Sequence, residues 1–420
     1  MKKYLIIAAS AAAVLAAGCA KNEVIEGSIP QQAVTFGVYA GQSATKATYG
    51  DITTANLQTS ADGFSVFAYY TLDADWASTD TPNFMYNQQV RKIDSYAAHS
   101  EANPSDYSSA RYPSGWYYSP LKYWPNGQNA TTYSQNPTSA DKLSFYAYAP
   151  HIARSDLGTV PATGEGITGI SANNATGAPT VTFTVPSKAE EQIDLLWAIP
   201  QLNLTKKGLN ERVTFNFKHA LAKLNFKVQA VVDAISPTTA NLQDDGDGSI
   251  EHGETWILLE SLDVTANGAK TGTLTLDGTT NPNWTTPSGS ITVQYTTASF
   301  SSTATANGKT GFKATETATE LNSSVSPMII PATVTSGNFT IIAKYWVITM
   351  DNALDGYFST VQNVISTTST GDITFDAGKK YNITVRLGLN GVDFSATVTD
   401  WDGSPADQPF DLPLNTNTTI

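Results

Sequence analysis

Hydrophobic and polar residues alternate with a period of two along most of the chain. The hydrophobic runs are short and rich in Thr, Val, Ile, Phe and Tyr, and Gly, Asn, Asp, Ser or Pro separates them, as in strands joined by turns. The predicted strands cover residues 33–40, 64–70, 143–148, 180–185, 256–265, 272–276, 291–295, 339–348, 381–387 and 392–399. Helical periodicity is weak, and 352–364 is its best example. The pattern predicts an all-β protein built of sandwiches.

Residues 213–228 contain two hydrophobic runs of opposite parity. Alternate residues are hydrophobic in each run, and the runs are Val213-Phe215-Phe217 and Leu224-Phe226-Val228. Because a strand cannot exchange its faces without a break, we expect a bulge or turn near His219-Ala220-Leu221. The preceding stretch 204–212 is polar and typical of a turn, so we place a domain boundary there. One sandwich is then expected over residues 28–205 and a second over 206–420.

The N-terminus has the order of a secretory signal peptide. Lys2 and Lys3 precede an uncharged hydrophobic run that ends in small residues before Cys19. The run is shorter than the about 20 residues that a membrane-spanning helix needs. Cys19 is the only cysteine, and with the preceding Leu-Ala-Ala-Gly it is similar to a bacterial lipobox, in which the thiol is acylated. We predict a signal peptide over 1–18 and a lipid anchor at Cys19; an ordinary signal peptide with an incidental cysteine is the alternative.

Composition excludes one class of partner and one kind of stabilisation. The net charge of −13 argues against nucleic acid, whose binding needs a basic stripe. A chain with a single cysteine cannot form an internal disulfide, so its stability must come from packing. The 420 residues are enough for two hydrophobic cores. Abundant polar and aromatic residues, with only 15% charged residues, suit extracellular β-sandwiches.

An ordered set of motifs resembles one family. The motifs are Thr45-Lys46-Ala47, YSP at 118–120, YWP at 123–125, LSFYAYAP at 143–150, QIDLLWA at 192–198, FKHALAKLNFKV at 217–228 and FSATVTDW at 394–401. Together with the lipobox they resemble the fimbrillin (Mfa-like, type V pilin) family of Bacteroidetes. The resemblance implies two tandem transthyretin-like Greek-key β-sandwich domains. It also implies a structural and adhesive fimbrial subunit that is exported as a lipoprotein to the cell outer membrane, exposed on the surface, and joined to other pilin subunits.

The resemblance further implies assembly by donor-strand exchange. A protease removes the lipidated segment 19–46, and a terminal strand of a neighbouring subunit fills the groove that the first strand leaves. The inward face of that displaced strand consists of Val34, Phe36, Val38 and Ala40. Cleavage is expected between Lys46 and Ala47, where members of the family usually carry Arg. The alternative is that Lys46 is a solvated loop lysine in an uncleaved subunit.

The C-terminal tail is a candidate donor strand. Phe410, Leu412 and Leu414 alternate along it, as the inward residues of a strand do. Pro409 and Pro413 make it a poor central strand, because proline cannot donate to the ladder.

An acidic segment over 243–254 is a candidate calcium loop. With Gly248 at the sharp turn, oxygen ligands come from Asp245, Asp247, Ser249, Glu251 and Glu254. The first ligand position holds Gln243 instead of Asp, however, and no helices flank the loop. The alternative is a solvated acidic hairpin, so Ca2+ is a candidate ligand and not a required cofactor.

The aromatic stretch 107–125 is a candidate glycan site. Flat rings can stack on sugars, and the residues proposed for this are Trp116, Tyr117, Tyr123 and Trp124. Loop and core packing is the competing interpretation. A glycan site here would suit the alternative function, a monomeric surface-exposed lipoprotein that binds glycan. Host or glycan ligands are therefore candidate partners besides other pilin subunits.

Catalytic motifs do not occur in the sequence. The four histidines lack the H-E-x-x-H spacing of a metalloprotease, and neither a G-x-S-x-G elbow nor a glycine-rich phosphate loop is present. His219 is interpreted as a packed residue at the strand break. We therefore predict that the protein is not an enzyme and has no catalytic residues.

Overall fold

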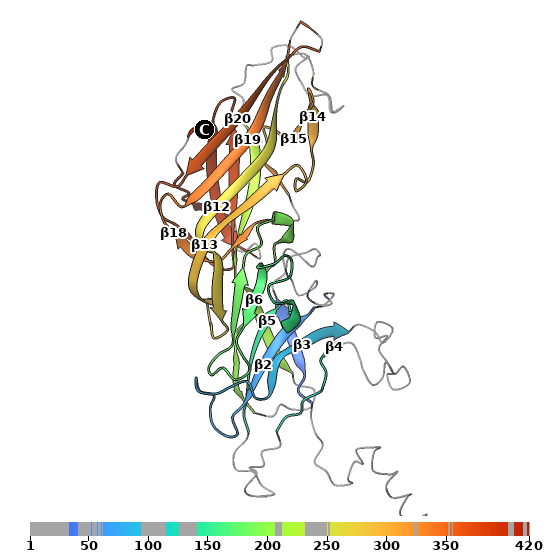
Figure 1. Cartoon of the computed structure of the whole chain (residues 1–420), viewed down its shortest axis with the longest axis vertical. Helices are drawn as coiled ribbons and strands as arrows, with labels where there is room; N and C mark the ends of the chain where they lie inside the picture. Colours follow the sequence, from blue (N-terminus) through green and yellow to red (C-terminus); the bar gives the residue numbers. More distant parts are fainter. Residues whose placement is uncertain are drawn as a thin grey trace, which may run out of the picture.

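The computed structural model describes most of the chain beyond its N-terminal region. The described residues are 33–40, 52, 57, 60, 62–93, 115–125, 141–205, 212–231, 250, 253–322, 326–351, 353–354, 356–401, 407–414 and 418–419. They form an elongated body in which strands from the first half of the chain lie at one end and strands from the second half at the other (Figure 1).

The first half of the chain supplies most of an eight-stranded sheet. Its order is β1 (Phe36–Ala40), β10 (Val213–His219), β8 (Leu196–Ala198), β5 (Leu143–Ala149), β2 (Phe64–Tyr70), β3 (Met85–Ile93) and β4 (Gly115–Tyr117), with β9 (Gln201–Leu204) also paired to β5. Both faces of its centre are covered, because β5 is buried at every position and β2 at all but its last.

The second half supplies most strands of a six-stranded sheet and of a nine-stranded sheet, and it also forms a two-stranded ribbon. The six-stranded sheet has the order β16 (Thr319–Glu320), β11 (Ala222–Ala230), β22 (Lys379–Leu387), β23 (Val392–Asp400) and β24 (Gln408–Phe410), with β17 (Met328–Ile329) on β11. The nine-stranded sheet has the order β14 (Ala304–Ala306), β15 (Lys309–Ala314), β12 (Thr255–Thr275), β19 (Phe339–Met350), β20 (Phe358–Thr368) and β25 (Thr418–Thr419). Strands β13 (Asn283–Thr296) and β7 (Thr180–Thr184) also pair with β12, β6 (Gly166–Ile170) pairs with β7, and β18 (Ala332–Val334) pairs with β21 (Ile373–Phe375).

The all-β prediction is confirmed. Two short 3-10 turns also occur among the described residues, η2 (Arg154–Asp156) and η3 (Ala189–Glu191). In the described part of the chain, no helix is long and apolar enough to cross a membrane. The predicted strands 256–265 and 272–276 fall, except for residue 276, on the single 21-residue strand β12. The register of β12 with β13 shifts between Asn267 and Thr273.

The helical interpretation of 352–364 is wrong. Residues 358–364 belong to β20, which pairs with β19 over its whole length. The β-branched residues Thr360, Val361 and Val364 suit an extended strand, and pairing with β19 outweighs the weak helical periodicity.

The predicted break near 219–221 is confirmed and is larger than a bulge. Strand β10 ends at His219 and β11 begins at Ala222, and the two strands belong to different sheets. Sheet membership therefore changes here and not at the expected boundary between 205 and 206. The reason is that β10 pairs with β1 and β8, which keeps it in the first sheet.

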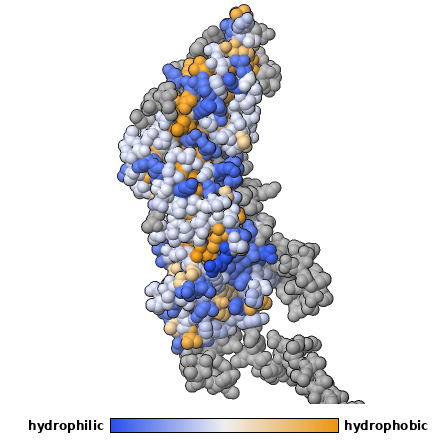
Figure 2. All heavy atoms as spheres, viewed as in Figure 1, coloured by the Kyte–Doolittle hydropathy of each residue, from blue (hydrophilic) through white to orange (hydrophobic). Residues whose placement is uncertain are grey.

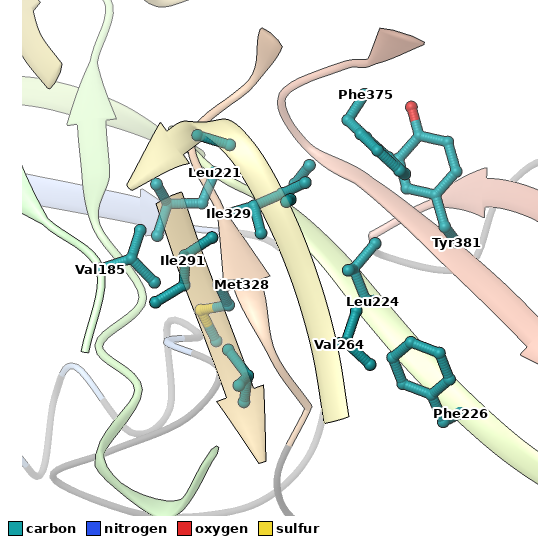
Figure 3. Close-up of a cluster of buried hydrophobic side chains, with 14 of the residues drawn as sticks. Val185, Leu221, Leu224, Phe226, Val264, Ile291, Met328, Ile329, Phe375 and Tyr381 are labelled. Carbon is teal, nitrogen blue, oxygen red and sulfur yellow. The ribbon is translucent and has the colours of Figure 1, made fainter. Parts of the chain in front are cut away.

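The two halves of the chain share a hydrophobic core. One cluster joins Phe67 and Tyr146 of the eight-stranded sheet to residues of the six- and nine-stranded sheets such as Phe226 and Val264. Figure 3 shows part of this cluster, in which Leu224, Ile291 and Met328 lie between the strands that carry them. The hairpin of β6 and β7 extends the nine-stranded sheet, so the first half also contributes backbone pairing to the second. A division into two separate transthyretin-like domains stays a prediction.

Hydrophobic and hydrophilic residues are mixed over the face of the molecule seen in Figure 2. Small hydrophobic groups are separated by hydrophilic residues along its length. Such interspersion is typical of protein surfaces.

The faces of β11 can be tested by substitution. Leu224→Ala should lower the free energy of unfolding by about 2–5 kcal/mol, because Leu224 is fully buried and the variant leaves a cavity. Lys227→Ala on the same strand should change it by less than about 0.5 kcal/mol, because Lys227 is only partly buried. Denaturant unfolding measures both values, and similar losses for the two variants would contradict the assigned faces.

Candidate functional site

Strand β1 is the end strand of the eight-stranded sheet. It pairs in parallel with β10, from Phe36 opposite Val213 to Ala40 opposite Phe217. Just before it, the N–H of Val34 donates to the carbonyl oxygen of Lys122 at 2.9 Å. Residues 33 and 34 thus bridge to 122 and 123 on one side, whereas β1 itself pairs only with β10 among the described strands. Loss of this segment would leave the ladders between the other strands intact.

The side chains of β1 and the residues before it divide into two faces. Val34 and Phe36 are buried, and Val38 is partly buried against the same cluster. Tyr39 points the other way and is 54% exposed. Ala40 lies in the strand, and its side chain is outside the described part of the structure. The strand therefore inserts one hydrophobic face into the core and leaves the other in solvent.

Phe36 is the centre of an aromatic cluster. Its ring is stacked on that of Phe215 at 5.7 Å, and three more rings surround it at 5.4 Å (Tyr118), 6.0 Å (Phe145) and 6.2 Å (Phe64). Each such pair stabilises by about 0.5–1.5 kcal/mol beyond the burial of its area. The strand is consequently held by side-chain packing as well as by its ladder.

Tyr118 connects this cluster to the backbone of the first strand. Its hydroxyl donates to the carbonyl oxygen of Val34 at 2.9 Å. Burial raises the pKa of Tyr118 to about 12, so the phenol keeps its proton and remains a donor at neutral pH. The YSP and YWP motifs thus form part of the wall around β1.

The two tryptophans proposed for glycan stacking are buried in this wall. Trp116 is packed on Phe64 with ring centroids 5.1 Å apart, and Trp124 on Phe145 at 6.0 Å. Their faces contact the core and are not available to a sugar, so this part of the stacking prediction is wrong. Tyr117 is half-buried and Tyr123 is 43% exposed. Core packing is the interpretation that fits.

Most of the other predicted site residues lie outside the described part of the chain. These are Cys19, Lys46, Ala47, Asp245, Asp247, Ser249 and Glu251. Glu254 is described, and its carbonyl oxygen accepts the N–H of Met350 at 3.0 Å. Among the described residues, no three His, Cys, Asp or Glu side chains gather as metal ligands would. Calcium binding stays a prediction.

The C-terminal tail lies along edges of its own sheets. Strand β24 pairs with β23, and β25 pairs with β20. The ring of Phe410 packs on Tyr381 at 4.7 Å, and Leu412 and Leu414 contact the shared core. The alternation of these three residues in the sequence therefore corresponds to contacts within the same chain.

A family model described as fimbrillin-like matches residues 45–401. The chain belongs to the fimbrillin-like family. Among curated proteins, this fimbrillin-like chain is similar to the fimbrium subunit Fim1C of Phocaeicola vulgatus, with 34% identity over 230 residues. That match covers 52% of this chain and 49% of the relative, so it spans about half the length of each.

The fold is also found in a solved fimbrial protein. The crystal structure of a fimbrial protein from Bacteroides vulgatus aligns with a TM-score of 0.59 and 22% identity, over 89% of this chain and all of that one. At this identity the likeness concerns the fold alone. It supports the all-β, multi-sheet architecture of the fimbrillin-like chain.

The packing of β1 predicts unequal effects of substitution on its two faces. Phe36→Ala should cost about 3–5 kcal/mol of unfolding free energy, because four ring contacts are lost. Tyr39→Ala should cost less than about 1 kcal/mol, because its side chain is largely exposed. Chemical denaturation of both variants checks this, and a larger loss for Tyr39→Ala would show that β1 is not packed in this way.

Proposed function

We propose that the protein is a structural and adhesive fimbrial subunit that polymerises by donor-strand exchange. The observation that carries the proposal is the geometry of β1, an end strand whose hydrophobic side chains fill an aromatic pocket. The fimbrillin-like family match supports the fimbrial role. In this proposal the lipid on Cys19 holds the precursor at the outer membrane, and the partners are other pilin subunits.

Removal of β1 would create a strong acceptor. The backbone edge of β10 over 213–217 would lose its partners, and the pocket around Phe36 would be empty. Burying Val34 and Phe36 contributes about 3–6 kcal/mol, at about 1.5–3 kcal/mol for each side chain. This is a large part of the about 5–15 kcal/mol that typically stabilises a domain. A strand from another subunit would restore both the ladder and the packing.

The C-terminal tail has the features that a donor needs. Phe410, Leu412 and Leu414 repeat at the same spacing as the inward residues Val34, Phe36 and Val38. In the single chain the tail is held by short ladders, since β24 has three residues and β25 has two. Such short pairings can open more readily than the long ladders of the sheet interior. We infer that the tail leaves its own sheet edges to fill the groove of a neighbour.

Cleavage at Lys46 should trigger assembly. Treatment of the full chain with a lysine-specific protease should yield a product that begins at Ala47 and forms a ladder in detergent gels without boiling. The Lys46→Arg variant treated with a trypsin-like protease should give the same product and the same ladder. The Lys46→Ala variant should remain uncut after residue 46 and stay monomeric. Intact mass and unboiled gels give the two readouts, and a cut chain that stays monomeric would contradict strand exchange.

Deleting the tail should produce a subunit that accepts a strand but cannot donate one. A chain that lacks residues 408–420, once cut, should stop the growth of ladders when mixed in excess with the cut full chain. A chain that lacks only 415–420 keeps Phe410, Leu412 and Leu414 and should polymerise. Equal polymerisation of both truncated chains would exclude the tail as the donor.

A further inference from the structure

Three residues from distant motifs meet where the two halves of the molecule join. Asp194 lies just before β8, His219 is the last residue of β10, and Trp401 follows β23. They come from the QIDLLWA, FKHALAKL and VTDW motifs. All three are buried, and the side chain of Asp194 is fully inaccessible. We call these residues the junction cluster.

The junction cluster is closely packed. The His219 Nδ1 atom lies 3.0 Å from Oδ1 and 2.9 Å from Oδ2 of Asp194. The imidazole is stacked on the indole of Trp401, with ring centroids 4.2 Å apart and planes 3° from parallel. A carboxylate without access to solvent is costly unless it accepts several hydrogen bonds, so the position of Asp194 depends on its partners.

One partner of Asp194 belongs to the start of the retained chain. The N–H of Ile52 donates to Oδ2 of Asp194 at 2.7 Å. The side chain of Ile52 packs against the cluster that contains Phe36, and Leu57 is buried in that cluster. Ile52 follows Lys46 closely in the sequence, on the C-terminal side of the proposed cut. Asp194 therefore holds the chain just beyond the segment that would be removed.

The junction cluster also lies next to the end of the acceptor groove. Ala40, the last residue of β1, is opposite Phe217 of β10. Strand β10 ends two residues later, at His219. Backbone hydrogen bonds hold the surrounding chain in place. The N–H of Trp401 donates to the carbonyl oxygen of Gly378 at 2.8 Å, and the N–H of Gly378 donates to the carbonyl oxygen of Leu221 at 2.9 Å. The strand that borders the groove is thereby connected to the second half of the molecule.

We propose that Asp194 is the anchor that holds the new N-terminal part of the cut subunit at Ile52. His219 and Trp401 keep this anchor attached to the second half, so that the groove retains its shape until a strand of a second copy enters. The inference rests on the proposed removal of β1. Without the anchor, the chain ahead of Leu57 would fray after the cut, and the packing of Ile52 against the groove would be lost.

Hydrogen exchange at the amide of Ile52 tests the anchor directly. In the unsubstituted chain this amide should stay protected after the cut at Lys46. In Asp194→Ala it should exchange at least about tenfold faster, because a charge-assisted hydrogen bond is lost. Asp194→Asn should restore most of the protection, since its amide oxygen can accept the Ile52 N–H and its NH2 group can donate to Nδ1 of a neutral imidazole.

Asp141→Ala is the matched control. Asp141 is also buried and accepts a hydrogen bond from the hydroxyl of Tyr70 at 2.9 Å. Its substitution removes a buried carboxylate elsewhere in the first half, so Ile52 exchange should stay within about threefold of the unsubstituted chain. Protection of Ile52 that is equal in Asp194→Ala and Asp141→Ala would overturn the anchor.

Uptake of a synthetic peptide of residues 31–42 by the cut chains tests the consequence for the groove. The Asp194→Ala chain should bind this peptide about tenfold more weakly than the Asp141→Ala chain. Equal affinities would show that Asp194 does not maintain the shape of the groove. If the unsubstituted cut chain does not bind the peptide, strand exchange is wrong, and the exchange rate of Ile52 alone decides on the anchor. If Asp194→Ala does not fold, the cut unsubstituted chain decides. Exchange of Ile52 as slow as that of the amides of β5, which keeps its partners β2 and β8, supports the anchor, and unprotected exchange overturns it.

Discussion

The edges of the sheets are the constraint on which this molecule depends. Each open sheet ends in a strand whose outer N–H and C=O groups can pair with another chain. Here β1 closes one side of the eight-stranded sheet, while β24 and β25 lie on edges of the two sheets of the second half. The first and the last described strands thus lie at sheet edges.

Packing explains why these edge strands are specific. Phe36 is surrounded by four aromatic rings, and Phe410 packs on Phe375 and Tyr381. A replacement strand has to present side chains of similar size at every second position. Backbone pairing supplies affinity to any extended peptide, whereas these pockets select among peptides.

A chain with one cysteine has to hold its elongated shape by packing alone. The structure does so by continuing one core through both halves and by inserting the hairpin of β6 and β7 beside β12. The junction cluster adds a polar contact between segments far apart in the sequence, since Ile52 and Asp194 are separated by 142 residues. Loss of β1 would therefore disturb one edge while the connection between the halves persists.

The sequence by itself determined many of the strands and which of their faces is hydrophobic. Alternation is a local property, so strands over 64–70, 143–148 and 339–348 were predictable, and they lie in β2, β5 and β19. The break near 219–221 was predictable for the same reason. The partners of each strand were decided only by the tertiary structure. Pairing with β1 and β8 kept β10 in the first sheet, pairing with β19 made 358–368 a strand, and burial turned Trp116 and Trp124 inward. The free energy that selects these pairings comes from contacts between residues far apart in the chain, and no local pattern records it.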